Sequence, residues 1–336
     1  MNSHTRPPWL DWGVLCAVLG VLTLALLVLG LGVGSTGWHS PLASWQGGPE
    51  WQILWDIRLP RTLGAWLVGA LLGLAGAVAQ GLFRNPLAEP YLLGSSSGAA
   101  LAVALSLVLL GHTTLMSDAG WGWRFGLTGA AFVGAVGGVL LTLFLARGAA
   151  HTMRLLLAGV VVGVVLGALT SLLMVWSADV WRAMQTFMLG NTGLLGWPAC
   201  GVLLWAWLMV MPIALMLSRV LDALTLGEDT VRSLGIPLGW ARTALVAVLA
   251  LATAAAVAQA GLVAFVGLAA PHLVRRHAQT RHAALLLASS LMGGVLLQAA
   301  DVLARWLIAP QEIPVGVLTA VLGGGYLLWL MHRRVS

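Results

Sequence analysis

Lysine is absent from this sequence, and all 17 basic residues are arginines. A phosphate-binding loop of the type G-x-x-x-x-G-K-[ST] needs a lysine to reach the nucleotide phosphates. The absence excludes this loop, so any nucleotide hydrolysis that drives the protein has to belong to another chain. No Ser-His-Asp or metal-ligand grouping indicates an enzyme either. We therefore expect a chain without catalytic residues, without a metal site and without a cofactor of its own.

Charge of either sign is scarce. Charged residues make up 8% of the 336 residues and hydrophobic residues 60%, and the mean hydropathy is +0.94. These values are typical of an integral membrane protein, and we expect a single transmembrane domain over residues 1–336. A net charge of +6 would also fit a nucleic-acid-binding protein, but the arginines are scattered between apolar runs. We expect membrane lipid, and no nucleic acid, as a partner.

Few reactive groups lie inside the apolar runs. The two cysteines, Cys16 and Cys200, indicate neither a disulfide framework nor a metal site. The acids Glu89, Asp301 and Glu312 fall near the ends of runs. Because an ion-coupled carrier usually needs an ionisable group within the membrane, energy input from outside the membrane domain is the better hypothesis. The amides inside the runs are expected to hydrogen-bond between helices: Gln80, Gln259 and Gln298.

Ten apolar runs predict an all-α, polytopic membrane protein with about ten transmembrane helices. The run after Gly261 is short and contains Pro271, so we expect a broken or half-length helix there. The predicted spans are 13–33, 62–82, 91–110, 124–146, 154–175, 199–217, 242–260, 261–275, 283–303 and 314–331.

The arginines indicate the orientation of these spans. With the N-terminus inside, twelve arginines fall on the cytoplasmic side and five on the other, which agrees with the positive-inside rule. We therefore expect both termini in the cytoplasm. The inner set is Arg6, Arg84, Arg147, Arg154, Arg219, Arg232, Arg242, Arg275, Arg276, Arg281, Arg333 and Arg334, and the outer set is Arg58, Arg61, Arg124, Arg182 and Arg305.

A weak internal repeat accompanies this topology. The segment from Arg61-Thr62 through Ala77-Val78-Ala79-Gln80 is similar to the segment from Arg242-Thr243 through Ala256-Val257-Ala258-Gln259. The first copy would run inward and the second outward, as in the inverted repeats of transporters, although chance similarity between apolar spans is the competing explanation.

The segment from Asp222 to Trp240 is a short amphipathic island between two apolar runs. A Thr225-x-x-Glu228 pair fits the start of a helix, and Gly235 followed by Pro237 fits a stop and a second start. We expect two short helices joined by a bend. A connection this well specified indicates a docking surface for a cytoplasmic partner, and the alternative is a helix that rests on the lipid surface.

On the outer face, Arg58 and Arg61 flank a proline, and Arg305 follows Asp301 by one helical turn. Asp301 and Arg305 would form an intramolecular ion pair in one interpretation. In the other, the guanidinium groups of Arg58, Arg61 and Arg305 receive carboxylates of a soluble partner, because arginine binds a carboxylate with two parallel hydrogen bonds. The sequence leaves both open.

Several short motifs follow one another in order from Arg58 onward. They are Arg58-Leu-Pro-Arg61, Asn85-Pro-Leu-Ala-Glu-Pro90, Leu93-Gly94-Ser-Ser-Ser-Gly98, Leu226-Gly-Glu-Asp229, Ser233-Leu-Gly235, Phe265-Val-Gly-Leu-Ala-Ala-Pro271-His272, Asp301-x-x-x-Arg305 and Glu312-Ile-Pro-Val-Gly316. Together these motifs resemble the membrane permease of the iron-siderophore, haem and vitamin B12 class of ATP-binding-cassette (ABC) importers. A departure is Gly325-Tyr326, where that family usually has proline and phenylalanine.

The resemblance implies a type II importer permease fold in the bacterial inner membrane. It also implies a homodimer, two cytoplasmic ATPase subunits that bind ATP and magnesium, and a periplasmic or lipid-anchored substrate-binding protein. That binding protein would meet Arg58, Arg61 and Arg305, and His151, Thr152 and Met153 would lie at the cytoplasmic gate. The ATPase-docking residues would be Asp222, Leu226, Gly227, Glu228, Asp229, Arg232, Ser233, Leu234 and Gly235.

The predicted function is thus translocation of an iron chelate (haem or a ferric siderophore) or of cobalamin, and the sequence does not choose among them. The alternative belongs to a different functional class: a secondary active carrier or exporter that works without an ATPase.

Overall fold

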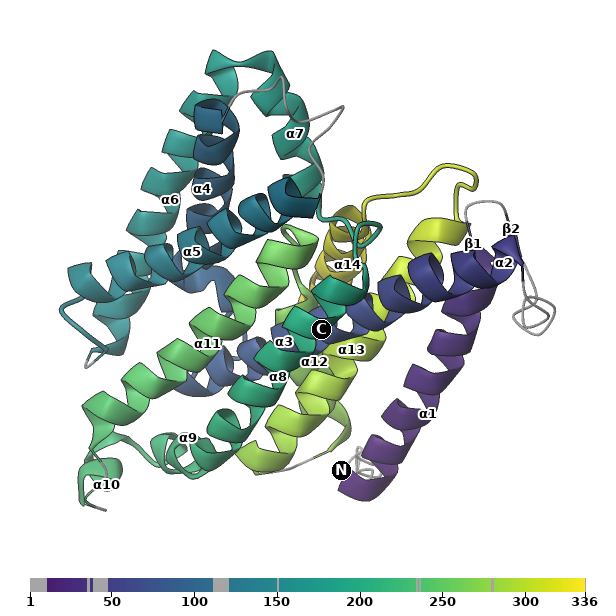
Figure 1. Cartoon of the computed structure of the whole chain (residues 1–336). Helices are drawn as coiled ribbons and strands as arrows, with labels where there is room; N and C mark the ends of the chain where they lie inside the picture. The colour runs from purple at the N-terminus through teal and green to yellow at the C-terminus, as the bar shows by residue number, and fades with distance from the viewer. Residues whose placement is uncertain are drawn as a thin grey trace.

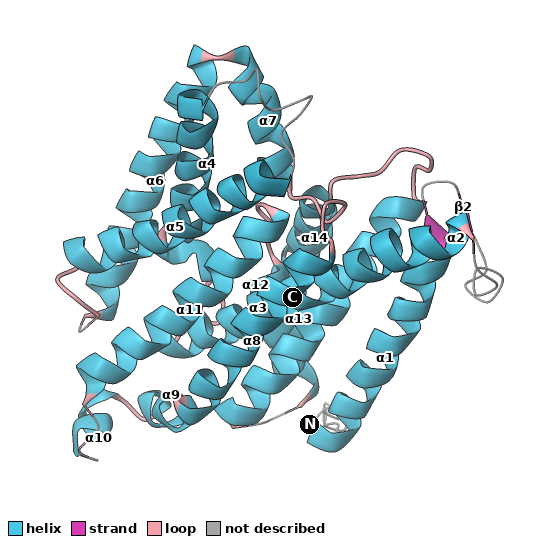
Figure 2. Ribbon diagram, viewed as in Figure 1, coloured by secondary structure: helices cyan, strands magenta, loops and turns pink. Residues whose placement is uncertain are grey.

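The computed structural model describes residues 11–34, 37–38, 48–110, 121–149, 151–233, 235, 237–278 and 281–335. Figure 1 traces the chain through these residues, and Figure 2 shows that they are helical almost throughout. Loops and turns connect the helices, and the strands among the described residues form a small antiparallel hairpin of β1 (Val33–Gly34) and β2 (Gly37–Trp38) after the first helix.

Ten helices coincide with the ten predicted spans, so the sequence-based fold class is confirmed. Helix α12 is only 12 residues long and contains Pro271, so the short helix predicted after Gly261 is confirmed. The ten helices are α1 (Trp12–Gly32), α3 (Leu59–Phe83), α4 (Ser95–Leu110), α5 (Trp121–Leu145), α6 (Thr152–Trp176), α8 (Trp197–Met216), α11 (Leu238–Ala260), α12 (Val266–His277), α13 (His282–Trp306) and α14 (Val315–Val335).

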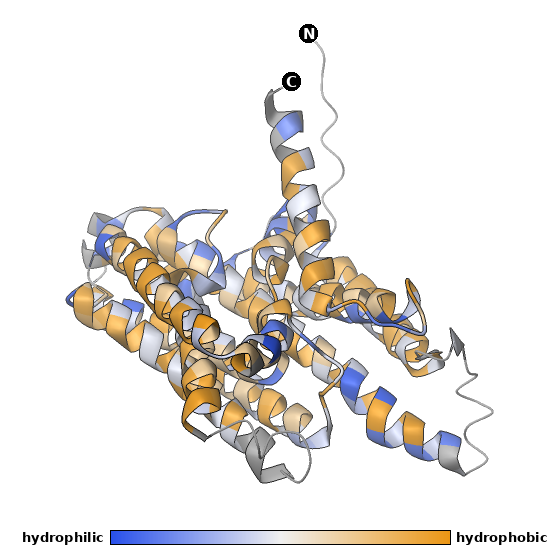
Figure 3. Ribbon diagram, turned by 90° about the horizontal axis from the view of Figure 1, so that it is seen from above, coloured by the Kyte–Doolittle hydropathy of each residue, from blue (hydrophilic) through white to orange (hydrophobic). Residues whose placement is uncertain are grey.

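Seven of the helices in the described part of the chain are long and apolar enough to cross a membrane by themselves. They are α1, α5, α6, α8, α11, α13 and the continuous helical stretch from Glu50 that ends with α3, while α4 and α14 contain shorter apolar stretches. Figure 3 shows that apolar residues run along the peripheral helices as well as the central ones. Many of their side chains are exposed, such as Val164, Trp205 and Met209, as expected where lipid replaces water.

Shorter elements connect the spans. The four-residue α2 (Pro49–Gln52) runs through a π-helical turn, η2 (Ile53–Arg58), into α3, and a 3₁₀ turn, η3 (Pro90–Leu93), precedes α4. Helices α9 (Ser218–Thr225) and α10 (Glu228–Ser233) lie between α8 and α11. Helix α7 (Ala178–Leu189) follows α6 and was not predicted from the sequence.

Helix α3 is the centre of the fold. It packs against α13, α11, α12 and α8, and nearly every one of its residues from Pro60 to Phe83 is buried. A helix that is apolar on all sides is stable in this position because other helices, rather than lipid, surround it.

Small residues allow this close packing. A side-chain Cβ at Gly69 would lie 2.2 Å from the backbone oxygen of Gly293, and one at Gly73 would lie 2.1 Å from that of Ser289. These contacts join α3 to α13. At Gly76 the corresponding distance to the backbone oxygen of Gly267 in α12 is 1.7 Å, so even alanine does not fit.

The helix contacts agree with the internal repeat. Helix α3 packs along α13, and α11, which carries the second copy of the repeated sequence, packs along α5 in the same relation. Counting α3, α4 and α5 as one copy and α11, α12 and α13 as the other, each pair joins the first helix of one copy to the third helix of the other copy. This arrangement is the one expected if the two halves share one packing pattern.

Replacing Gly76 with alanine tests the role of the small residues. Because a backbone atom of α12 occupies the space, we expect Gly76→Ala to lower the free energy of unfolding by about 1–3 kcal/mol. Gly167→Ala in α6 is the matched control, since nothing lies within 4 Å of its Cβ position. The measurement is the thermal unfolding midpoint in detergent, and equal midpoints for the two variants would contradict this packing.

Candidate functional site

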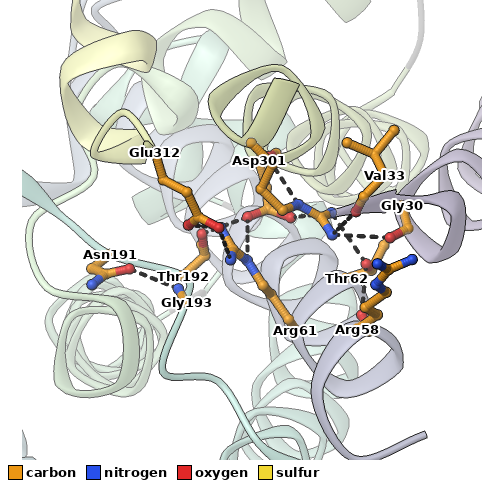
Figure 4. Close-up of polar contacts among 11 residues, drawn as sticks. Gly30, Val33, Arg58, Arg61, Thr62, Asn191, Thr192, Gly193, Asp301 and Glu312 are labelled. Atoms are coloured by element: carbon orange, nitrogen blue, oxygen red, sulfur yellow. Dashed lines mark hydrogen bonds and ion pairs between the residues drawn. The ribbon is translucent and has the colours of Figure 1, made fainter. Parts of the chain in front are cut away.

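A buried ion-pair network lies where the N-terminal end of α3 meets the C-terminal end of α13 (Figure 4). Asp301, whose side chain is fully buried, accepts from Arg61 Nε at 3.0 Å and from Arg305 Nη2 at 2.6 Å. The hydroxyl of Thr192 donates to the same carboxylate at 2.6 Å. One carboxylate is thus shared between two guanidinium groups from different helices.

Glu312 completes the charge balance of this network. Its carboxylate is 2.9 Å from Arg61 Nη2, and its side chain is 34% exposed. Two acids and two arginines therefore face each other, and their formal charges cancel. Burial of so many charged groups is tolerable only because each has an ionic or hydrogen-bonding partner.

The arginines also cap the first span. Arg305 Nη1 donates to the carbonyl oxygens of Gly30 at 2.9 Å and Val33 at 3.1 Å, and Arg58 Nη1 donates to that of Leu31 at 3.0 Å. The last carbonyls of a helix lack partners within the helix and carry a partial negative charge. The two cations satisfy them and fix the end of α1 against α3 and α13.

This geometry revises the expected roles of the outer arginines. Arg305 is 2% exposed and Arg61 is 8% exposed, so both are held by intramolecular ion pairs, and the predicted Asp301–Arg305 pair is present. Neither guanidinium group is presented to a soluble partner in this structure. Arg58 is half-buried and has no acidic partner among the ion pairs of the described residues. Sequence reasoning noted Glu312 and missed its pairing with Arg61.

At the other end of the same helices, the island holds α10 and the last turn of α9, and the bend between them is at Leu226–Gly227. The predicted second start, after Gly235 and Pro237, is confirmed, but it begins the long helix α11 and not a second short helix. Thr225 is the last residue of α9, and its hydroxyl bonds back to the Asp222 carbonyl, so the expected helix start at Thr225 is wrong. Glycine at 227 suits the bend because its φ of 109° is strained for other residues.

Ionic contacts hold this island to the helix bundle. Glu228 lies 2.5 Å from Arg242 Nη2 in α11 and 3.7 Å from Arg84 Nη2 at the end of α3. Asp222 accepts from the backbone N–H of His282, the first residue of α13, at 3.0 Å and lies 2.7 Å from its ring Nδ1. Helices α3, α11 and α13 are therefore all tied to the island.

The electrostatics of Asp222 follow from these contacts. Partial burial acts to raise the pKa of its carboxyl group. The hydrogen bonds from the backbone and ring of His282, together with the positive charges of His282 and Arg281, outweigh burial and lower the pKa below its ordinary value. The carboxylate is thus ionised at neutral pH and able to hold α9 against α13.

Three of the remaining residues predicted to dock a partner are exposed on this island. Leu226 is 71% exposed, and Ser233 and Gly235 are also exposed. Leu234 and the side chains of Asp229 and Arg232 lie outside the described residues.

The gate residues lie at the start of α6. His151 precedes the helix, Thr152 begins it, and Met153 is 72% exposed. Their placement at the end of a span agrees with the sequence-based topology and does not by itself assign a gate.

The three buried amides differ from one another. Gln80 donates to the Leu268 carbonyl oxygen at 3.2 Å and accepts from Arg275, so its predicted helix-to-helix bonding is confirmed. Gln298 is 1% exposed, and neither its oxygen nor its nitrogen has a hydrogen-bonding partner in the described chain, so the same prediction is wrong there. Gln259 lines a cavity.

Comparison with known proteins identifies the family to which this chain belongs. A model of the FecCD transport family matches residues 19–333. The chain belongs to the FecCD transport family. The vitamin B12 import system permease protein BtuC of Escherichia coli O157:H7 is 40% identical over 321 residues, which cover 94% of each chain. BtuC of E. coli O17:K52:H18 is 40% identical over 319 residues, with the same coverage.

Solved structures agree with the FecCD assignment. An inward-facing conformation described as a metal-chelate type ABC transporter has a TM-score of 0.83 and 28% identity, and the match covers 96% of this chain and 100% of that one. PsaBC from Streptococcus pneumoniae in complex with Fab, with a TM-score of 0.56 and 16% identity, shares the fold. This FecCD chain is a multi-pass inner-membrane permease of an ABC importer, and a secondary carrier is not favoured.

Removing the shared carboxylate tests the outer network. Asp301→Asn leaves two buried guanidinium groups without their main counter-charge, so we expect it to lower the free energy of unfolding by about 3–5 kcal/mol. Glu312→Gln is the control, because a partly exposed pair contributes about 0–1 kcal/mol. Thermal unfolding of both variants gives the comparison, and a milder loss for Asp301→Asn than for Glu312→Gln would contradict the arrangement.

Proposed function

We propose that this chain is the permease through which vitamin B12 enters the cytoplasm. The observation that carries this proposal is the 40% identity to vitamin B12 permeases across 94% of both chains, against 28% identity to the metal-chelate transporter structure. Sequence similarity over the full length supports a shared cargo better than a shared fold does, since a fold by itself does not determine function.

An iron chelate, either haem or a ferric siderophore, is the second candidate. Its support is the structural similarity to a metal-chelate type ABC transporter at a TM-score of 0.83. The two kinds of cargo are both large, and both need a wide path with weak contacts, because strong contacts in the membrane would hinder release on the inner side. Physical reasoning about the path therefore does not separate them.

The assembly that we propose contains a second copy of this chain, two cytoplasmic ATPase subunits and a periplasmic or lipid-anchored binding protein. ATP and magnesium would bind to the ATPase subunits, in keeping with the lack of lysine and of a phosphate-binding loop here. Both termini would lie in the cytoplasm. The excess of arginines, twelve against five, supports this orientation.

In this assembly α9 and α10 would seat in a groove of the ATPase. The docking surface would include Asp222, Leu226, Gly227, Glu228, Asp229, Arg232, Ser233, Leu234 and Gly235, and the support is the exposed, partly charged surface on two short helices. The residues Glu228 and Asp222 would act from the inner side of this surface, because they pair with α11, α3 and α13. A displacement of the ATPase would thus be passed to three spans.

On the outer face, Arg58 would meet an acidic residue of the binding protein directly. Arg61 and Arg305 would contribute only if the partner's carboxylate replaced Glu312, the more exposed acid of the network. His151, Thr152 and Met153 would form part of the cytoplasmic gate, which their position at the start of α6 supports.

The cargo can be identified from the binding protein that works with this permease. We expect the purified binding protein to carry a corrin, with its characteristic visible absorbance, and to stimulate ATP hydrolysis by the assembled transporter. Absorbance of a porphyrin or of a ferric siderophore, with equal stimulation, would retain the importer and reject the vitamin B12 proposal.

Neutralising Glu228 tests coupling between ATP hydrolysis and transport. Because Glu228 joins the island to α3 and α11, we expect Glu228→Gln to reduce ATP-driven uptake into vesicles at least about fivefold, while the ATPase subunits still hydrolyse ATP. Asp11→Asn is the control, since Asp11 is exposed before α1 and its side chain makes no capping hydrogen bond. Undiminished uptake by Glu228→Gln would refute the coupling role.

A further inference from the structure

A cavity of about 270 Å³ lies among α4, α5, α7, α8 and α11, on the other side of the α7–α8 connection from the ion-pair network that Thr192 joins. Its walls are mainly apolar, and they include Val103, Leu107, Leu127 and Phe187. Four polar side chains also line it: Thr128, Thr186, Asn191 and Gln259. An apolar cavity with a few polar groups is the usual form of a small-molecule site.

The polar groups of this cavity lack partners. Gln259 and the hydroxyls of Thr128 and Thr186 make no hydrogen bond in the described chain, whereas Thr142, Thr170 and Thr253 all bond to carbonyls of their own helices. The Asn191 oxygen accepts from the backbone N–H of Gly193 at 2.7 Å, and its amide nitrogen has no partner among the described residues. Several donors therefore remain for a ligand.

These donors lie close to one another. The backbone N–H of Asn191 donates to the carbonyl of Ala260 at 2.8 Å, which holds Asn191 beside the end of α11 where Gln259 lies. Thr186 is on the last turn of α7, five residues before Asn191. The polar end of the cavity is thus at the α7–α8 connection, and Val103 and Leu107 of α4 extend the apolar part.

The depth of the cavity in the membrane follows from the same elements. It lies at the starts of α5 and α8 and at the end of α11, which are the outer ends of these spans in the proposed orientation. Trp181 and Trp197, two residues or fewer from lining residues, are 48% and 37% exposed. Exposed tryptophans are typical of the boundary between the lipid headgroups and the hydrocarbon core.

We propose that this cavity binds a phospholipid of the outer leaflet. One alkyl chain would lie along Val103 and Leu107, and the ester carbonyls near the glycerol would accept hydrogen bonds from Gln259 and Asn191. Ala183, Thr186 and Leu194 are exposed lining residues, so the chain enters from the membrane at that side. At about 270 Å³ the cavity is below the range of sites for drug-sized molecules, so it suits one alkyl segment rather than the cargo.

A phospholipid with a photoreactive diazirine in one alkyl chain tests this site. In wild-type protein reconstituted with this lipid, we expect cross-links at the lining residues of α4 and α7. Ala183→Leu fills the open side, and Gln259→Leu removes a hydrogen-bond donor, so each should reduce labelling of these residues about fivefold. Gly137→Leu is the control, because Gly137 is exposed on α5, outside the cavity, with nothing within 4 Å of its Cβ position.

Size-exclusion profiles and thermal midpoints equal to those of the wild type establish that each variant is folded. Labelling that is unchanged in Ala183→Leu and Gln259→Leu would mean ordinary contact with surrounding lipid and would overturn the proposal. Absence of labelling in the wild type, as expected if a second copy of the chain or water fills the cavity, would overturn it as well. The proposal does not depend on the identity of the cargo.

Discussion

The close contact between α3 and α13 is the constraint on which the rest of this structure depends. Lipid offers no hydrophobic force to press helices together, so these two spans rely on packing at small residues. Gly69 meets Gly293 and Gly73 meets Ser289, so the two helices run antiparallel with their backbones in contact. Backbone contact at two successive turns leaves little freedom for one helix to bend or slide without the other.

Both ends of this helix pair are tied by charge. Arg61 and Asp301 join the two helices at one end, while Arg84 and His282, at the opposite end, contact Glu228 and Asp222 of the island. A rigid pair of spans can pass a displacement at one end to the other end. The absence of ionisable groups from the middle of the pair fits a permease whose energy comes from a separate ATPase.

Much of this fold could be predicted from local sequence. Apolar runs located the ten spans, Pro271 indicated the short α12, and the charged residues after Asp222 indicated the short helix α10. Helix α9 begins at Ser218, before the island, and was not predicted. Helix α7 was missed because its apolar residues, such as Val180 and Met184, are interrupted by polar ones, so it has no continuous apolar run. The outer network was predicted only in part. The Asp301–Arg305 spacing is local, whereas Arg61 is 240 residues from Asp301, and no periodicity connects them.

The central claim is that this chain is a conduit moved by ATPase subunits bound to its inner face. Uptake of radiolabelled cobalamin into vesicles tests it most directly, with the permease reconstituted alone or with its ATPase and binding protein. We predict uptake only for the complete assembly, and only with ATP. Uptake against a gradient by the permease alone, driven by protons or sodium, would contradict the account.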